Sequence, residues 1–168
     1  MNRRVVITGL GVITSIGIGW EEFWDNLLQG KSGISPVTAF DTSNQFTHMG
    51  GEVKSFKPEE FIPKNKLKSL SRASQFAFAA AKLAVNDSQL NNMDFSGVPI
   101  GTCIGTTMGS VQTVEIIDEI IVKQGNTKFN NDLTCQVPTH STPSAVANAL
   151  GFHGPNMMFS TACAAGNY

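Results

Sequence analysis

The sequence is poor in charge, in cysteine and in histidine, and each shortage excludes a class of function. Only 15% of its 168 residues are charged and the net charge is −1, so no basic stripe is present of the kind that binds nucleic acid. The three cysteines form no C-x-x-C pair and the three histidines are scattered, which argues against a zinc site. An odd, sparse cysteine count also argues against a disulfide scaffold and favours a reducing, cytoplasmic compartment.

Long hydrophobic runs are missing as well. Arg3 and Arg4 precede the stretch VVITGLGVITSIGIG, which is how a signal peptide begins, but it has no leucine-rich centre and no small-x-small cleavage site. Its glycines and threonines also make it too polar for a membrane-spanning helix. We therefore expect no membrane segment here, but a buried strand over residues 4–8 followed by a glycine-rich turn.

Phosphate-binding motifs are not found either. Gly9 and Gly11 follow the first expected strand, but Thr14 stands where a dinucleotide-binding fingerprint needs a third glycine. No G-x-x-x-x-G-K-[ST] pattern occurs, which excludes a P-loop.

Apolar residues make up 41% of the chain, which is enough for a core. The length is that of one ordinary domain, and we expect residues 1–168 to form one. Because charge is scarce, we expect much of the chain to be buried, either within itself or against another element.

Strands and helices alternate along the sequence, which predicts the α/β class. Apolar side chains recur at helical spacing over residues 20–28, and Gly30 is a natural stop. The helix expected over residues 69–89 is rich in alanine, so we expect another element to pack very close to it. The other expected elements are a long decorated loop over 31–65, helices over 69–89 and 110–123, and strands over 98–106 and 157–160.

Two of these expectations concern the second half of the chain. The strand over 98–106 has almost no charge, so we expect it to be buried on both faces. A short helix should follow the third long one, with Thr142 as its N-cap, Pro143 as its first residue and Gly151 at its end.

Cys163 is the strongest candidate for a chemical role. It directly follows an apolar strand and lies among small residues in Thr161-Ala-Cys-Ala-Ala-Gly166. Small neighbours let a substrate carbonyl approach the sulfur, and backbone N–H groups at a helix start stabilise a thiolate. The position is that of a nucleophile on a sharp strand-to-helix turn, although the G-x-S-x-G pattern is absent. A buried structural cysteine is the alternative.

This segment, with Gly154-Pro155 and a strand before it, resembles the active-site segment of the β-ketoacyl-acyl-carrier-protein synthases, in particular their elongating, type II branch. The resemblance covers the whole chain and implies the thiolase-like, layered α/β/α fold, of which the chain would supply most of the N-terminal half. Three other stretches are similar in order and spacing: RRVVITGLGVITSIG, Leu28-Gln-Gly-Lys-Ser-Gly-Ile34 with Phe40-Asp41, and Ile104-Gly-Thr-Thr-Met-Gly109.

The resemblance implies a condensing enzyme of fatty acid or polyketide synthesis. Cys163 would take an acyl group from a carrier-protein thioester, with its own backbone N–H as an oxyanion donor, and the acyl-enzyme would then react with a decarboxylated malonyl thioester. We assign substrate binding to Thr107, Met108 and Ala162. Met108 matches an apolar residue that gates the acyl pocket; core filling is the alternative for it.

The resemblance also implies an acyl carrier protein as partner and a homodimer. It implies no metal and no organic cofactor, because the acyl group arrives on the phosphopantetheine arm of the carrier, which is substrate.

The histidines depart from the family pattern. The family uses two histidines and a lysine from its second half, and His48, His140 and His153 match none of them. We expect His48 at the surface; a dyad of Cys163 with His140 or His153 is an alternative. We interpret the chain as the N-terminal portion of a condensing enzyme, partial or half of a split protein. The other interpretations are a non-catalytic dimerisation or carrier-binding fragment and a thiolase, against which the TACAAG segment argues.

Overall fold

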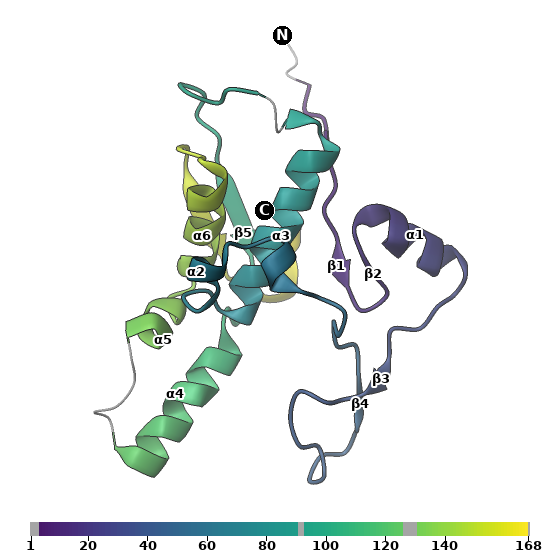
Figure 1. The fold of residues 1–168 in the computed structure, drawn as a ribbon, viewed down its shortest axis with the longest axis vertical. Coiled ribbons are helices and arrows are strands. Elements are labelled where there is room, and N and C mark those ends of the chain that lie inside the picture. The colour runs from purple at the N-terminus through teal and green to yellow at the C-terminus, as the bar shows by residue number, and fades with distance from the viewer. Residues whose placement is uncertain (1–3, 91–92, 126–130, 168) are drawn as a thin grey trace. The chain divides into compact units, whose positions relative to one another are not determined.

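The structure is a computed structural model that describes residues 4–90, 93–125 and 131–167 (Figure 1). The chain divides into two compact units, residues 1–57 with 80–92 and residues 58–79 with 93–168. Helix α3 (Arg72–Asp87) is continuous and contributes one half to each unit.

Besides the second half of α3, the described residues of the first unit form extended backbone, two small hairpins and the helix α1 (Trp20–Leu28). β1 (Ile13–Thr14) pairs antiparallel with β2 (Gly17–Ile18), and β3 (Ser35–Pro36) pairs antiparallel with β4 (Met49–Gly50). Helix α1 packs against β2 and has the bounds that its apolar spacing predicts. The long loop expected after it therefore does contain short elements.

The strand expected over residues 4–8 is wrong. The backbone there forms no ladder, and its side chains are exposed, with Val5 at 95%. A β-branched run becomes a strand only where a neighbouring strand supplies hydrogen bonds, and no described strand pairs with this one.

The N-terminal segment lies directly on the second half of α3, within the first unit (Figure 1). A Cβ atom at Gly9 would collide with the carbonyl oxygen of Ala84, and one at Gly11 with that of Ala80. The close approach expected from the alanine-rich helix is thus confirmed. The carboxylate of Asp87 stabilises this contact, since it accepts hydrogen bonds from the backbone N–H of Leu10 at 2.8 Å and from the indole N–H of Trp20 at 2.9 Å.

The second unit is built on one parallel strand pair. β5 (Thr102–Gly105) pairs with β6 (Asn156–Phe159), in the register Thr102 opposite Asn156 through Gly105 opposite Phe159. The described residues between the strands form the helices α4 (Val111–Gln124), α5 (Asn131–Gln136) and α6 (Ser141–Leu150), of which α6 packs on both strands (Figure 1). The 3₁₀ helix η1 (Pro58–Glu60) and α2 (Lys64–Leu67) precede α3, and the 3₁₀ helix η3 (Ala162–Asn167) follows β6.

The expected burial of β5 on both faces is wrong. Thr102 is buried, but Cys103 and Gly105 are exposed. The reason is that α6 covers one face of a sheet that has two strands in the described part of the chain. The strand is also shorter than residues 98–106.

The start of α6 differs from the expectation by two residues. His140 is its N-cap, and Thr142 lies inside the first turn instead. Pro143 still falls in that turn, where its missing N–H leaves no hydrogen bond unmade. The end is confirmed, because Gly151 terminates the helix in the left-handed conformation at φ 69°. Helix α5 was not expected, since six mostly polar residues carry no apolar periodicity.

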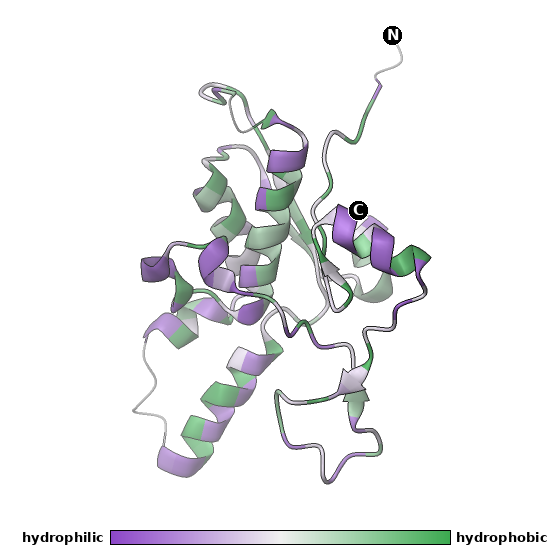
Figure 2. Ribbon diagram, turned by 45° about the vertical axis from the view of Figure 1, so that its right-hand side comes forward, coloured by the Kyte–Doolittle hydropathy of each residue, from purple (hydrophilic) through white to green (hydrophobic). Residues whose placement is uncertain are grey.

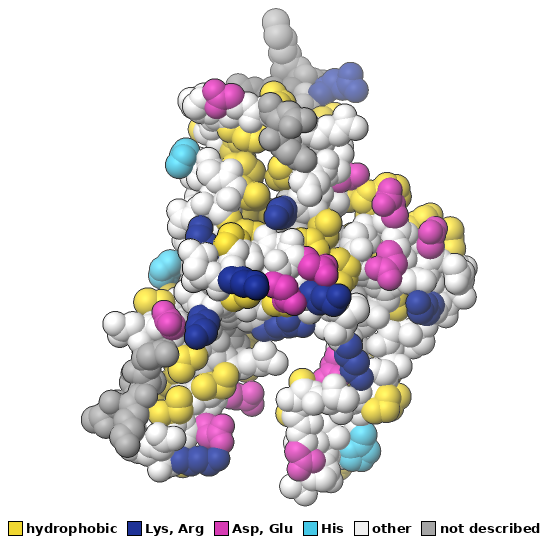
Figure 3. Space-filling view, in the orientation of Figure 1, with side chains coloured by type: hydrophobic (Ala, Val, Ile, Leu, Met, Phe, Trp, Pro, Cys, Tyr) yellow, Lys and Arg dark blue, Asp and Glu magenta, His cyan; other side chains and the backbone are white. Residues whose placement is uncertain are grey.

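Little of the apolar content is buried. In the second unit the buried hydrophobic side chains are those of Ile62, Phe78, Ala79, Val146, Ala147 and Ala165. Large apolar residues of α1 and α4 reach the surface (Figure 3), and the hydropathy colouring of Figure 2 shows hydrophobic positions on both helices. The scarcity of charge therefore accompanies exposed apolar surface here, not a large core. Among the described residues, no helix is both long and apolar enough to cross a membrane.

Glycines allow the segments around β6 to lie close to β5 and to the residues just before it. A Cβ atom at Gly105 would collide with the carbonyl group of Ala165, so η3 lies directly on the strand. On the other side, Gly154 approaches Ile100 and donates its N–H to the Ile100 carbonyl oxygen at 2.8 Å. Both positions require the absence of a side chain.

The first prediction concerns Asp87. In Asp87→Ala the Leu10 amide and the Trp20 indole lose their acceptor, and we expect the melting temperature to fall by about 2–4 °C. Hydrogen exchange of the Leu10 amide should become faster. Asp25→Ala, which removes an exposed carboxylate from α1, is the control and should change neither the melting temperature nor the exchange rate. Unchanged exchange of the Leu10 amide in Asp87→Ala would contradict the role of Asp87 as its acceptor.

The second prediction concerns Gly105. Gly105→Ala should lower the free energy of unfolding by about 1–3 kcal/mol, because the methyl group meets backbone that cannot move without shifting η3. Gly166→Ala is the matched control, since its Cβ would meet nothing within 4 Å. Urea denaturation measures both. Equal stability of the two variants would mean that η3 does not rest on β5.

Candidate active site

Cys163 lies on the turn that leaves β6. The strand ends at Phe159, and η3 begins at Ala162, so the predicted helical turn is present as a 3₁₀ helix. The thiol-bearing residue is exposed, which contradicts the alternative of a buried structural cysteine. Exposure is a condition for a cysteine that acts as a nucleophile.

Ala162 holds this turn in a strained conformation. Its φ is +51°, in the left-handed region that costs an L-residue with a Cβ atom about 1–2 kcal/mol. The turn is fixed after it by the Ala164 N–H, which donates to the Thr161 carbonyl at 3.2 Å, and by Ala165, which is buried against β5. Such strain concentrates at functional sites.

The parallel pairing brings a second turn to the same edge of the sheet. The Thr106 N–H donates to the Phe159 carbonyl at 3.0 Å and so extends the ladder beyond β5. Both chains then leave at the carboxyl ends of their strands, the edge at which α/β proteins bind ligands. Thr107 and Met108 follow there, and Met108 is 67% exposed, so it does not fill the core. The structure thus places Thr107, Met108, Ala162 and Cys163 on two turns of one edge.

The turn after β5 is itself tightly closed. Gly109 has φ +60°, and its N–H donates to the hydroxyl of Thr106 at 3.2 Å. Ser110 is the N-cap of α4, and its carbonyl accepts the N–H groups of Thr113 and Val114. Only glycine adopts such a φ at no cost, so Gly109 fits this turn.

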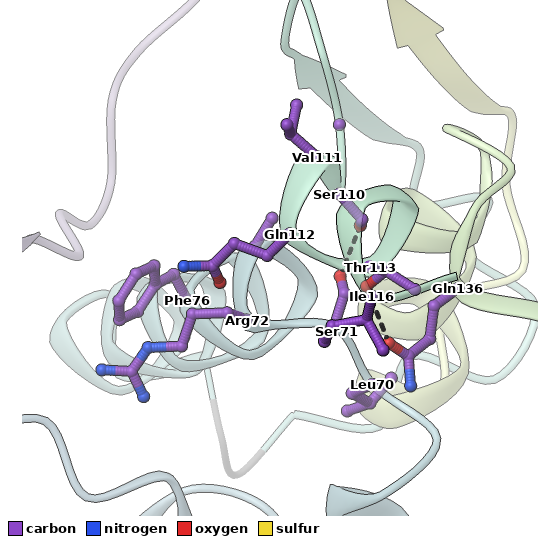
Figure 4. A pocket seen from close by; sticks show the side chains of 12 residues that line it. Leu70, Ser71, Arg72, Phe76, Ser110, Val111, Gln112, Thr113, Ile116 and Gln136 are labelled. Atoms are coloured by element: carbon purple, nitrogen blue, oxygen red, sulfur yellow. Dashed lines mark hydrogen bonds between the residues drawn. The ribbon is translucent and has the colours of Figure 1, made fainter. Parts of the chain in front are cut away.

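A cavity of about 490 Å³ opens beside this turn, between the starts of α3 and α4 (Figure 4). One side carries Arg72, whose guanidinium lies 4.4 Å from the centre of the Phe76 ring; burial lowers the pKa of Arg72. On the other side the Ser110 hydroxyl donates to Ser71 at 2.6 Å, as the dashed line in Figure 4 marks.

Sequence reasoning missed this cavity, because the expected helices over 69–89 and 110–123 included both serines. In the structure Ser71 and Ser110 directly precede α3 and α4, where capping residues are common. Arg72 is the sole ionisable side chain that lines it in the described residues. We therefore assign it no step of the chemistry.

The histidines do not form a dyad with Cys163 in this structure. His48 is exposed, as predicted, and its Nδ1 lies 3.1 Å from the Thr42 hydroxyl. His140 and His153 are exposed at opposite ends of α6, which spans about 15 Å at 1.5 Å per residue. Within residues 4–90, 93–125 and 131–167, no hydrogen bond joins either of them to Cys163, and no group of three or more His, Cys, Asp or Glu side chains could hold a metal ion.

The chain is similar to known proteins over its whole length. The family described as "Beta-ketoacyl synthase, N-terminal domain" matches residues 2–168. The 3-oxoacyl-[acyl-carrier-protein] synthase 2 of Synechocystis sp. (strain ATCC 27184 / PCC 6803 / Kazusa) is 36% identical over 165 residues, which are 98% of this chain and 40% of that protein. The chain therefore spans about two fifths of the length of this curated relative.

Solved structures agree with the sequence comparison. The ishigamide ketosynthase/chain length factor superposes with a TM-score of 0.90 at 33% identity, over 100% of this chain and 42% of that one. A type II polyketide synthase acyl-carrier protein in complex with its ketosynthase, bound to the hexaketide, gives a TM-score of 0.70 at 25% identity, over 98% of this chain and 40% of that one.

These likenesses confirm the expected α/β, thiolase-like fold, of which the described residues form an N-terminal portion. They also confirm the resemblance that the TACAAG segment and the N-terminal stretch indicated. The chain belongs to the β-ketoacyl synthase family and corresponds to its N-terminal domain.

Proposed function

We propose that this chain carries the acyl-accepting part of a β-ketoacyl-acyl-carrier-protein synthase, an acyltransferase, and that Cys163 is the residue acylated. One observation carries the proposal: an exposed cysteine on a strained turn, at the carboxyl edge of a parallel strand pair. Membership of the β-ketoacyl synthase family supports it.

The acyl transfer is a thioester exchange in which the Cys163 thiol is the only group of this chain that changes its bonds. Its Sγ attacks the thioester carbonyl of an acylated carrier, a carbon–sulfur bond to Cys163 forms, and the bond to the phosphopantetheine sulfur breaks. The carrier thiol receives the proton that Cys163 loses. We assign the backbone N–H of Cys163 as a donor to the oxyanion of the tetrahedral intermediate.

The condensation follows on the acyl-enzyme. A malonyl thioester loses carbon dioxide, and the resulting carbanion attacks the acyl carbonyl, so that a carbon–carbon bond forms and Cys163 is released. Because the family resemblance assigns this step to two histidines and a lysine of the second half, we give this chain the acyl-accepting role.

Thr107, Met108 and Ala162 are proposed to bind the acyl substrate. Thr107 and Met108 are exposed on the turn after β5, at the edge that also carries Cys163. An unbranched, flexible methionine adapts to acyl chains of different length. The side chain of Ala162 is small, so it leaves room for the substrate carbonyl to approach the sulfur of Cys163.

An acyl carrier protein is the proposed partner, and a second copy of this chain the proposed subunit. A relative's name and the solved ketosynthase complex both involve such a carrier. We place the protein in the cytoplasm, where its three cysteines, all free and exposed, would remain reduced. We propose no metal and no organic cofactor, since the acyl transfer written above needs neither.

Acylation of the chain tests the central assignment. After incubation with hexanoyl-pantetheine, we expect peptide mass spectrometry to find the hexanoyl group on Cys163. The Cys163→Ala variant should stay unmodified, because no other thiol lies on a strained turn at this edge. Cys103→Ala is the matched control, since Cys103 is also exposed, and it should react like the unchanged chain.

A hexanoyl group on Cys103 or Cys135, with Cys163 free, would contradict the assignment. The chain would then be better described as a non-catalytic carrier-binding or dimerisation module, and its binding to an acyl carrier protein would be the next quantity to measure.

Met108 is tested by acyl-chain length. In Met108→Ala, we expect acylation of Cys163 by a sixteen-carbon thioester to slow about fivefold, because roughly 1 kcal/mol of apolar contact is lost. A four-carbon thioester should be affected less. Met157→Ala, which shortens another exposed methionine of the same unit, is the control. Equal slowing for both lengths would remove Met108 from the acyl path.

A further inference from the structure

We propose that Ser110 and Ser71 are positioning residues that fix the turn carrying Met108, and thereby set the preference of Cys163 for acyl-chain length. The inference rests on the proposed function, because it takes Met108 as a residue that contacts the acyl chain. Four observations carry it.

A chain of buried hydroxyl groups connects three helices of the second unit. Ser110 donates to Ser71 at 2.6 Å, Ser71 donates to Ser74 at 3.0 Å, and Ser74 pairs with Thr142 at 2.9 Å. All four side chains are buried. Ser110 and Ser71 each donate their one hydroxyl proton along this chain, and either hydroxyl of the Ser74–Thr142 pair can be the donor. The four hydroxyl groups therefore link α4 through α3 to α6.

Ser110 does not cap its own helix. A serine at an N-cap usually accepts an N–H from the first turn, but the Ser110 side chain makes no such bond. Ser71 does cap α3, since its hydroxyl accepts the Ser74 N–H at 3.2 Å. The Ser110 hydroxyl therefore joins α4 to α3 instead of stabilising α4 alone, as the view along the cavity shows (Figure 4).

The turn that carries Met108 is anchored at both ends. At its start, the Thr106 N–H is bonded to the Phe159 carbonyl of the neighbouring strand. At its end, Ser110 is bonded to Ser71. Three residues lie between the anchors, and one of them, Gly109, has a left-handed backbone closed onto the Thr106 hydroxyl.

So short a segment between two fixed points retains little conformational freedom. The hydroxyl pair thus determines where the backbone of Met108 lies along the edge that also carries the Cys163 turn. Since Met108 itself is exposed, its own packing does not hold it there.

Three substitutions test this role, and each changes a different feature of the hydrogen bonding. Ser110→Ala removes the link but leaves the Ser71 hydroxyl its bond from the Ser74 N–H, so no buried donor is orphaned. Ser110→Thr keeps a hydroxyl at the same position. Thr113→Val is the matched control, because Thr113 is a buried hydroxyl of the same helix, bonded to Gln136 at 3.0 Å, that joins α4 to α5 and does not anchor the turn.

Two readouts are measured on the full chain. The first is NMR relaxation of the Met108 ε-methyl group, assigned by its loss in Met108→Ala. The second is the ratio of the rate constants for acylation of Cys163 by sixteen-carbon and four-carbon acyl-pantetheines. In Ser110→Ala we expect a more mobile methyl group and a ratio that moves toward one by about two- to fivefold, because the effect acts through Met108 and does not exceed that of losing its side chain.

Ser110→Thr should restore both values, and Thr113→Val should lower the melting temperature without changing either. A Met108 methyl group unchanged in Ser110→Ala overturns the positioning role. A mobile methyl group with an unchanged ratio overturns the effect on selectivity. Failure of the unchanged chain to acylate at Cys163 overturns the proposed function, and with it the effect on selectivity, while the methyl relaxation still decides the positioning role.

Discussion

Four paired positions join β5 to β6, and one further bond, from the Thr106 N–H to the Phe159 carbonyl, continues the ladder past the end of β5. Because the strands are parallel, both chains leave the pair at the same edge. Two turns far apart in the sequence are thereby brought together, one with Met108 and one with Cys163. Every assignment made to the candidate site depends on this register.

The surrounding structure fixes the two turns by different means. The turn after β6 depends on close backbone packing: η3 lies on Gly105, Ala165 is buried there, and this contact maintains the unfavourable φ of Ala162. The turn after β5 depends on hydrogen bonds, through Gly109 at its centre and Ser110 at its end. Each turn presents one exposed sulfur-containing side chain on a constrained backbone.

The sequence allowed good predictions where local pattern and tertiary packing agree. The apolar spacing placed α1 correctly, and small residues around Cys163 predicted the sharp turn. The same reasoning failed at residues 4–8, because a β-branched run does not show whether a partner strand exists. It also failed for the burial of Cys103, because scarce charge does not reveal how many faces of a sheet are covered.

The positioning link between Ser71 and Ser110 lay beyond such reasoning. Each serine is recognisable as a potential cap, but spacing along the chain does not show which helix starts meet in space. That information comes from the tertiary packing that brings the starts of α3, α4 and α6 together, which depends on many residues at once.

The most direct test of the account is a crystal structure of the chain after acylation with a long-chain acyl-pantetheine. The account predicts density for a thioester on the Sγ atom of Cys163, with the acyl chain leaving along the turn that holds Met108. Density on another cysteine, or an acyl chain directed away from the Met108 turn, would contradict the assignment of this edge as the acyl-accepting site.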